Sequence, residues 1–313
     1  MLDIIWTIAP IFLLIVLGNL LRRNGIPSVE FWNLNDKIVY WILFPALLFH
    51  TTSTLQLSGG MFGSYAAIIL SGFGGAVVFS LVSARLCGMP GTVASSVLQG
   101  AARHNTFIAL AVADRIFGTE GLALAALVTA VLIPITNIVV VTLMVGMLPQ
   151  KEERSVVRAI LRDLARNPLL ISVLLGVAFN LSGAGLVPVL HDTTDILGGA
   201  ALPIVLLCIG ANLRLKQMKA STLPVVLSMA GKFVAFPAAM YVAILAVGMQ
   251  GLPALIAMIF ACVPTAASSF TLSRQMGGDA PLMAAIVTLQ TLISFVTLPI
   301  AIVLLGRVFG VSF

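Results

Sequence analysis

The stretch GAARHNTFIALAVADRIFG, residues 100–118, places Arg103, His104 and Asn105 side by side between two apolar runs. The chain around it is 313 residues long, 60% hydrophobic and only 9% charged, with a mean hydropathy of +1.12. So little polar surface cannot keep a globular domain in solution, and the composition therefore indicates an integral membrane protein. Three adjacent polar side chains in the middle of a membrane span need a physical reason.

Apolar runs long enough to cross a bilayer recur from one end of the chain to the other. A hydrocarbon core about 30 Å thick needs roughly 20 apolar residues per helix, and a helix satisfies its own backbone hydrogen bonds in lipid. The runs lie at 4–21, 36–56, 62–86, 92–117, 120–148, 167–183, 193–213, 220–247, 252–276 and 279–306. The sequence therefore predicts an all-α membrane protein with ten transmembrane helices.

Basic residues are concentrated in alternate loops. The loops after the first, third, fifth, seventh and ninth runs hold most of the 17 lysines and arginines, which give a net charge of +6. By the positive-inside rule these loops face the cytoplasm, so we expect a multi-pass protein of the cytoplasmic (inner) membrane with both termini on the outer face. This explains the basic excess without nucleic acid, and the expected partner of these runs is the lipid bilayer.

The three cysteines give no sign of a metal or redox site. Cys87, Cys208 and Cys262 lie far apart in apolar segments, without the close spacing that metal ligands show. We expect them to be packing residues and expect no cofactor and no metal.

The two halves of the chain repeat at a nearly constant offset. Pro10 corresponds to Pro168 at an offset of 158 residues, and AALVT at 125–129 corresponds to AAIVT at 284–288 at an offset of 159. Each half has five runs, and since five is odd the second half enters the membrane from the opposite side. This predicts the 5+5 inverted repeat typical of secondary transporters. The predicted domains are a first repeat at 1–148, a cytoplasmic connector at 149–166 and a second repeat at 167–313.

The offset of 159 carries Asn105 of the fourth run onto Pro264 near the centre of the ninth. A proline inside a helix removes a hydrogen bond, and an asparagine side chain competes with the helical backbone, so we expect both helices to be broken. Lipid tolerates such breaks only where they line a cavity or are buried in protein. Each new half-helix presents its positive N-terminal end, an arrangement that suits an anionic ligand.

The candidate substrate-binding residues lie beside these breaks or carry a positive charge within a span. A charge at the bilayer centre costs several kcal/mol and is normally functional or paired. For the two cations of the set, a structural role at the ends of the broken helices stays open as an alternative. The candidates are Asn105, His104, Arg103, Thr106, Pro264, Thr265 and Lys232.

Two further sets of residues rank below these. The polar side chains of one set can line a path or simply bond across helix interfaces. Its members are His50, Asn137, Ser268, Gln290, Ser269 and Ser294. The other set contains His104 and Asp114, which are candidates for proton coupling, while for His104 a ligand contact and a plain interhelical hydrogen bond stay open.

Six motifs carry a resemblance to a known family. They are PIFLLIVLG at 10–18, FPALLFHTTS at 44–53, RHNTF at 103–107, ALPIVLLCIGANL at 201–213, GKFVAFP at 231–237 and VPTAASSF at 263–270. In their order and spacing the chain resembles, over its whole length, the auxin efflux carrier family, which includes the plant PIN-formed carriers and bacterial permeases for malonate or malate. The resemblance implies a fold related to that of bile acid symporters and sodium/proton antiporters, with broken helices 4 and 9 crossing. Helices 1, 2, 6 and 7 would form a scaffold, dimeric in many members, and helices 3–5 and 8–10 a transport domain that moves as an elevator.

The resemblance also carries over two site residues and shows one departure. In the plant carriers an Asn at the first crossing and a Pro at the second lie by the substrate carboxylate, and here these positions are Asn105 and Pro264. Plant members have Pro before the Asn, where this chain has His104, so auxin itself is not implied. The long hydrophilic loop of many plant members is absent, which points to a prokaryotic source.

The sequence thus favours a secondary transporter of a small organic anion, a mono- or dicarboxylate, working by alternating access. The alternative is a cation-coupled (sodium or proton) exchanger or symporter on the same fold, which would need a pair of acids near the crossing. An intramembrane enzyme is a third class, but the sequence has no HExxH, no GxSxG and no carboxylate dyad at depth, so we expect no enzyme. A channel or receptor on this fold would leave no distinguishing mark.

Overall fold

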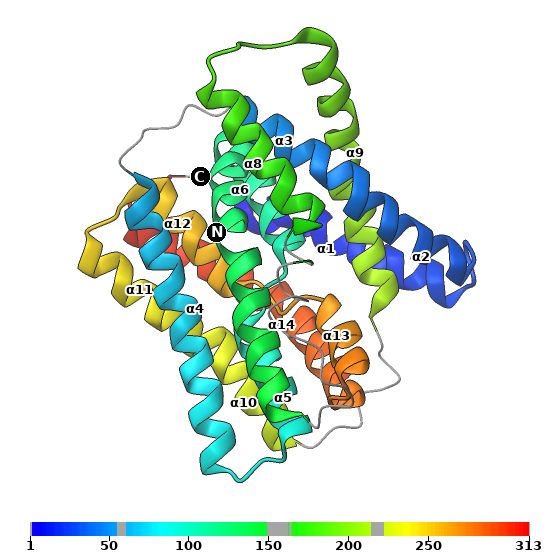
Figure 1. Cartoon of the computed structure of the whole chain (residues 1–313), viewed down its shortest axis with the longest axis vertical. Helices are drawn as coiled ribbons and strands as arrows, with labels where there is room; N and C mark the ends of the chain where they lie inside the picture. The colour runs from blue at the N-terminus through cyan, green and yellow to red at the C-terminus, as the bar shows by residue number, and fades with distance from the viewer. Residues whose placement is uncertain (1, 55–60, 149–161, 163–164, 214–221, 313) are drawn as a thin grey trace. The chain divides into compact units, whose positions relative to one another are not determined.

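The computed structural model describes residues 2–54, 61–148, 162, 165–213 and 222–312, and every regular element among them is helical. The predicted connector, 149–166, falls almost wholly outside these residues. The helices (Figure 1) are α1 Leu2–Arg23, α2 Val29–Ile38, α3 Phe44–Thr54, α4 Met61–Leu86, α5 Gly91–Ala102, α6 Thr106–Met147, α8 Pro168–Leu181, α9 Pro188–Asn212, α10 Thr222–Ala230, α11 Phe236–Val247, α12 Gly251–Cys262, α13 Ser268–Met276 and α14 Ala280–Val308, with π-helical segments η1 Val39–Leu43 and η3 Gly231–Ala235.

Six segments of the described chain are long and apolar enough to cross a membrane. They are Ile4–Arg23, Gly63–Leu86, Gly91–Met147, Pro188–Asn212, Thr222–Val247 and Ala280–Val308. The prediction of an all-helical membrane protein is confirmed at this level. Of the cysteines, Cys208 and Cys262 are buried as expected, but Cys87 is exposed just beyond α4, so packing does not explain it.

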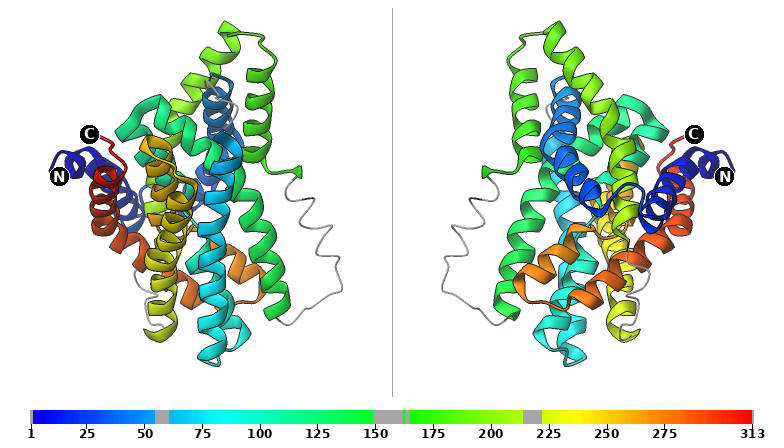
Figure 2. Two further views of the ribbon diagram at one scale, coloured as in Figure 1. Left: turned by 90° about the vertical axis from the view of Figure 1, so that its left-hand side faces the viewer. Right: turned by 90° about the vertical axis from the view of Figure 1, so that its right-hand side faces the viewer.

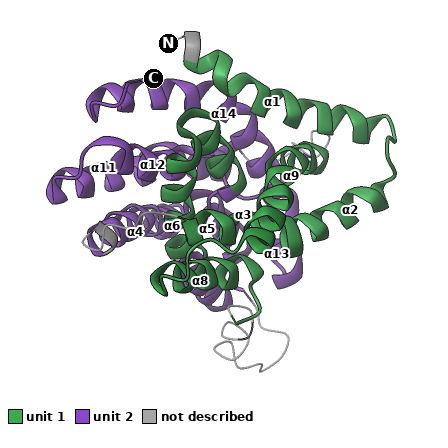
Figure 3. Cartoon of the chain, turned by 90° about the horizontal axis from the view of Figure 1, so that it is seen from above, with its two compact units in different colours: residues 1–59, 107–133, 162–212 green, residues 60–106, 134–161, 213–313 purple. Residues whose placement is uncertain are grey.

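The chain forms two compact units (Figure 3). Unit 1 contains residues 1–59, 107–133 and 162–212, and unit 2 contains residues 60–106, 134–161 and 213–313. Helix α6 therefore contributes to both. Within α6, Gly118 has a non-helical conformation (φ 60°, ψ −146°), at the position where the sequence separates its fourth and fifth apolar runs.

In unit 1, glycines bring helix backbones into close contact. Helix α1 packs on α9, and a side chain at Gly18 would overlap the carbonyl oxygen of Leu207, while one at Gly210 would overlap that of Ile15. Helix α8 packs on α3 in the same manner, because a side chain at Gly176 would overlap the Thr52 hydroxyl. Small residues are the usual means of tight helix association in membranes.

The α1–α9 contact supports a stability prediction. Replacing Gly210 with alanine is expected to lower the free energy of unfolding by about 1–3 kcal/mol, since overpacking forces the two backbones apart. Gly199→Ala in the same helix is the matched control, because a side chain there meets open space. Thermal unfolding in detergent checks this, and equal melting temperatures for the two variants would contradict it.

In unit 2, α4 packs on α11, and the two lie side by side in both views of Figure 2. A methyl group at Gly75 would overlap Ala239 Cβ, and one at Gly72 would crowd Met240. Helix α5 packs against α4 and α10, and α12 packs against α14.

Each π-helical segment precedes a Phe–Pro pair, Phe44–Pro45 after η1 and Phe236–Pro237 after η3. Proline lacks an N–H, and its ring clashes with the carbonyl one turn back in an α-helix. The wider turn accommodates it: Phe236 N donates to the oxygen of Gly231, five residues earlier. Such bulges often lie at functional sites, and η3 carries Lys232.

Candidate functional site

Two helices of unit 2 stop in the middle of their apolar runs. Helix α5 ends at Ala102 and α6 begins at Thr106, while α12 ends at Cys262 and α13 begins at Ser268. The residues that follow α5 and α12, Arg103 and Val263, have nearly the same extended conformation, with φ and ψ of −72° and 151° and of −69° and 153°. The predicted interruption of both helices is therefore confirmed.

The two breaks are joined by hydrogen bonds. The backbone N–H of Asn105 donates to the Pro264 carbonyl (2.8 Å), and the Thr265 hydroxyl donates to the carbonyl of Gln99 (3.0 Å). Gln99 lies in the last turn of α5, and its carbonyl also accepts from the Arg103 N–H (3.0 Å). Each break thus helps to satisfy the backbone of the other.

Gln290 of α14 ties the crossing to its neighbours. Its Oε1 accepts from the Thr265 N–H (2.9 Å), and its Nε2 donates to the Gly100 carbonyl (2.9 Å) and lies 3.1 Å from Ser228 Oγ. The sequence suggested that Gln290 lines a path, but its side chain is fully buried and holds three helices together. The closeness of α5 and α10 depends on Gly100, where any side chain would overlap the Ser228 hydroxyl.

Sequence reasoning did not single out Gln99. Its side chain is fully buried, and its Nε2 lies 2.8 Å from the Ser273 hydroxyl of α13. The available signal was its position, one turn before the predicted break, where an amide can bond freed backbone groups.

The basic side chains in and near the breaks of unit 2 are enclosed with few hydrogen-bond partners. Arg103 Nη2 donates to Ser268 Oγ (3.3 Å), but Nε and Nη1 are buried without a hydrogen-bond partner among the described residues. Both ring nitrogens of His104 and the Nζ of Lys232 are likewise buried without a hydrogen-bond partner among the described residues. Within the part of the chain that the structure describes, the one ion pair lies in unit 1, between His50 and Asp195, so no carboxylate balances these groups.

Arg103 and His104 lie on different sides of the break. Because Arg103 has an extended backbone, successive side chains point in opposite directions. Arg103, half-buried, reaches Ser268 at the start of α13, whereas His104 is 5% exposed and its ring lies 5.8 Å from that of Phe260 in α12. The two side chains therefore contact different helices, α13 and α12.

The remaining predicted residues of unit 2 differ in exposure. Asn105, Pro264 and Thr265 are buried, Thr106 and Asn137 are half-buried on α6, and Ser268 is exposed. Ser269 is buried 3.4 Å from Thr265 Oγ1, and Ser294 bonds within α14 to the carbonyl of Thr291.

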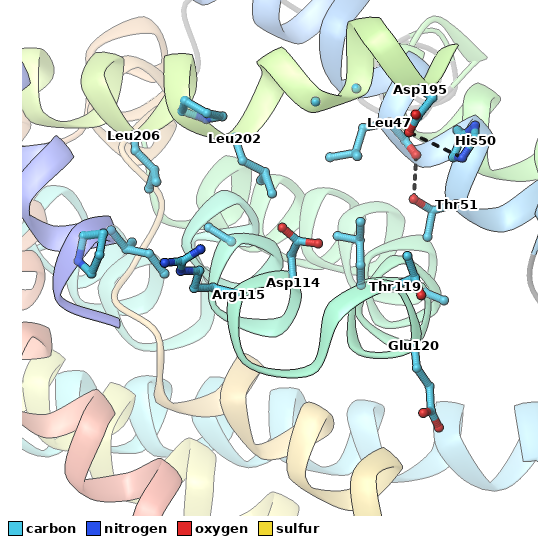
Figure 4. Close-up of a pocket in the computed structure, with 18 of the residues that line it drawn as sticks. Leu47, His50, Thr51, Asp114, Arg115, Thr119, Glu120, Asp195, Leu202 and Leu206 are labelled. Atoms are coloured by element: carbon cyan, nitrogen blue, oxygen red, sulfur yellow. Dashed lines mark hydrogen bonds and ion pairs between the residues drawn. The ribbon is translucent and has the colours of Figure 1, made fainter. Parts of the chain in front are cut away.

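His50 and Asp114 belong to unit 1, where they line a cavity of about 970 Å³ between α1, α3, α6 and α9 (Figure 4). Figure 4 shows the Asp114 carboxylate directed into this cavity and Glu120 pointing away from it. His50 Nε2 lies 3.6 Å from Asp195 Oδ1 at one end. The structure thus brings these two predicted residues together, in a different unit from the break residues.

Comparisons with known proteins cover nearly the whole chain. Residues 3–302 match the family described as "Membrane transport protein". A protein of Rhizobium meliloti named "Putative malonate transporter" is 31% identical in an alignment of 314 positions that covers 95% of this chain and 94% of that protein. An "Uncharacterized transporter" of Methanothermobacter thermautotrophicus is 23% identical over 298 residues, 94% of this chain and 96% of the relative.

Proposed function

Since the chain belongs to the membrane transport protein family, that of the auxin efflux carriers, and is a multi-pass membrane transporter, we propose that it carries a small organic anion through unit 2. The observation that carries the proposal lies at the joined breaks, where Nε and Nη1 of Arg103 and both ring nitrogens of His104 are buried without partners among the described residues. Buried charges in membrane proteins are normally paired, and here an anion supplies the missing partner. The family is one of transporters, and the proposal includes no catalysis.

The anion binds on the Arg103 side of the crossing. Arg103 offers Nε and Nη1, the two nitrogens without a partner among the described residues, and its Nη2 already contacts Ser268. The first residues of α6 and α13, Thr106 and Ser268, place the positive ends of two helices beside this position. Thr265 and Pro264 shape it through their bonds to the α5 break.

The ten-span inverted repeat is part of the proposal, and two contacts support it. Gly18 lies in close contact with Leu207. Adding 158 to the first number gives Gly176, and subtracting 158 from the second gives Phe49. These two residues are also in contact, since the Phe49 carbonyl oxygen lies 2.9 Å from a Cβ built at Gly176. Adding 159 to the number of Asn105 gives Pro264, and the Pro264 carbonyl accepts a hydrogen bond from the Asn105 N–H. A residue that contacts its own counterpart lies on the axis relating the two copies.

The span count follows from the lengths of the helices. The apolar segment Gly91–Met147 has 57 residues, about twice the length that one bilayer crossing needs. The break at Arg103–Asn105 lies within its first crossing, and the kink at Gly118 ends that crossing and starts the second. The remaining spans are α1, α2 to α3, α4, α8, α9, α10 to α11, α12 to α13, and α14.

The elevator mechanism is supported by the composition of unit 1. Unit 1 contains α1, α2, α3, α8 and α9, which are the first, second, sixth and seventh runs, together with residues 107–133 of α6, which belong to the fourth and fifth runs. We propose α1, α2, α3, α8 and α9 as the scaffold and as the surface of a homodimer. Helices 3–5 and 8–10 form the transport domain. The protein lies in the cytoplasmic membrane of a prokaryote with both termini outside, and both reported relatives are from prokaryotes.

The substrate class is a mono- or dicarboxylate, and the printed name of the Rhizobium meliloti relative supports a dicarboxylate such as malonate. One elementary charge is worth about 2.3 kcal/mol per 100 mV, so a negative-inside potential alone can drive anion efflux. If coupling exists, His104 and Asp114 are the groups that the sequence suggested. A cation-coupled exchanger stays the alternative function.

Solid-supported-membrane currents on proteoliposomes test the proposal. Challenges with malonate, malate, succinate, lactate, indole-3-acetate, sodium and pH jumps are compared between wild type and Asn105→Ala. We expect a saturable current for at least one carboxylate, weakened about tenfold or more by the substitution, because Asn105 loses an amide that both donates and accepts. Asn24→Ala, in an exposed turn, is the control. Silence to all organic anions with clear responses to sodium or pH would favour the exchanger.

A further inference from the structure

Lys232 is the most completely enclosed charged side chain in the described chain. It is 0% exposed, and its Nζ has no hydrogen-bond partner there. Its one favourable contact is the ring of Phe236, whose centroid lies 4.3 Å from Nζ. A cation–π contact of this kind offsets only part of the cost of an isolated buried ammonium group.

Lys232 is close to the crossing but lies apart from the Arg103 side. Its neighbour Gly231 faces the last turn of α5, since a methyl group there would lie 2.5 Å from Ala101 Cβ. Lys232 is within electrostatic range of His104 and of Cys262 at the end of α12. Arg103 instead bonds to α13. Arg103 and Lys232 therefore contact different elements, and each lies within electrostatic range of His104.

The groups around Lys232 offer no other negative charge. His104 at the α5 break and the Cys262 thiol at the end of α12 are within electrostatic range of it, while from α4 Phe79 lies against Gly231 and Gly75 lies near Ala235. Arginine remains charged in proteins, so Arg103 balances one negative charge of a ligand. A second negative charge needs a second positive charge. His104 and Lys232 are the enclosed groups of the described chain that can acquire one, and the lysine amine is the stronger base.

We propose that Lys232 takes up one proton when a dicarboxylate dianion binds at the breaks, and that a monocarboxylate binds without this uptake. The inference rests on the proposed function, namely that a carboxylate occupies the Arg103 side. The proton comes from the solution to which the site is open and joins the lone pair of Nζ. It leaves again when the dianion leaves, so dianion and proton are carried together. The coupling is reciprocal: the proton at Lys232 tightens dianion binding as much as the dianion favours the proton.

The number of protons bound can be measured directly by calorimetry. Malonate and acetate are titrated into the purified full-length protein at a pH where both malonate carboxyls are ionised. Each titration is done in two buffers of different ionisation enthalpy, and the difference gives the protons taken up per anion. We expect about one for malonate and about zero for acetate with the wild type.

Three variants locate the proton. Lys232→Met keeps the volume and removes a buried amine that has no hydrogen-bond partner in the described structure, so it should melt no lower than wild type. It should take up no proton and bind malonate about tenfold more weakly, with acetate unchanged. Lys232→Arg carries a permanent charge, and we expect it to bind malonate with no proton uptake. His104→Gln should still take up about one proton per malonate, whatever its affinity.

The outcomes separate the two proposals. Malonate binding without proton uptake in the wild type overturns the role of Lys232 and leaves the carboxylate site standing. Uptake that survives in Lys232→Met but disappears in His104→Gln also overturns it, in favour of the histidine. If a folded wild-type protein binds neither anion, the proposed function itself fails.

Discussion

Replacing Arg103 with glutamine is expected to lower carboxylate transport at low substrate concentration about 100-fold. Removing one partner of a buried, charged hydrogen-bonded pair costs about 2–5 kcal/mol, and each 1.4 kcal/mol is a factor of ten. The arginine has two buried N–H-bearing nitrogens without a partner in the described structure, so ligand binding and Arg103 depend on each other.

Two further variants sharpen this test. Arg103→Lys keeps the charge but loses the planar fork, and we expect an intermediate loss of about tenfold. Arg85→Gln removes an exposed arginine at the end of α4 and should transport as wild type does. Uptake of radiolabelled substrate into proteoliposomes measures the effect, with melting temperatures to verify folding. Wild-type uptake by Arg103→Gln would remove Arg103 from the binding site.

The second large effect is expected at Gln290. Methionine has a similar length but cannot bond the Thr265 N–H, the Gly100 carbonyl or the Ser228 hydroxyl, which would be left buried and unpaired. Hydrogen bonds between membrane helices average about 0.6 kcal/mol and reach about 1.7, so losing three costs about 2–4 kcal/mol. We expect a clearly lower melting temperature and loss of transport, because the break geometry depends on these bonds.

Gln250→Met is the matched control for Gln290. Gln250 precedes α12, is exposed, and makes no side-chain bond to the helix start. Its variant should melt like the wild type in the same detergent. If both variants melt together, the bonds of Gln290 contribute little, and the crossing is held by packing alone.

The sequence predicted the helical membrane class and the location of both breaks because these depend on local chemistry. Apolar runs report the solvent around a helix, and a mid-span Asn or Pro interrupts the backbone wherever it occurs. The repeat offset located the second break from the first, although Pro264 alone would have marked it as well.

Other features depend on contacts between distant segments or on amphipathic ends that hydropathy does not detect. The second apolar run was placed at 36–56, but α2 begins at Val29, where Ser28 accepts a hydrogen bond from the Phe31 N–H. The roles of Gln99 and Gln290 follow from partners 174 and 190 residues away, which no local pattern contains. The unit 1 cavity is lined by residues from four helices, so local sequence patterns could not predict it either.

The extra residue in η3 sets the rotational phase of everything that follows it in its helix. An α-helix turns by about 100° per residue, so the wider turn at Gly231–Ala235 rotates α11 relative to α10. Ala239 and Met240 point toward the glycines of α4 only because α11 is rotated in this way. A single-residue deletion in η3 would restore a regular helix and yet direct the wrong face of α11 at its partner.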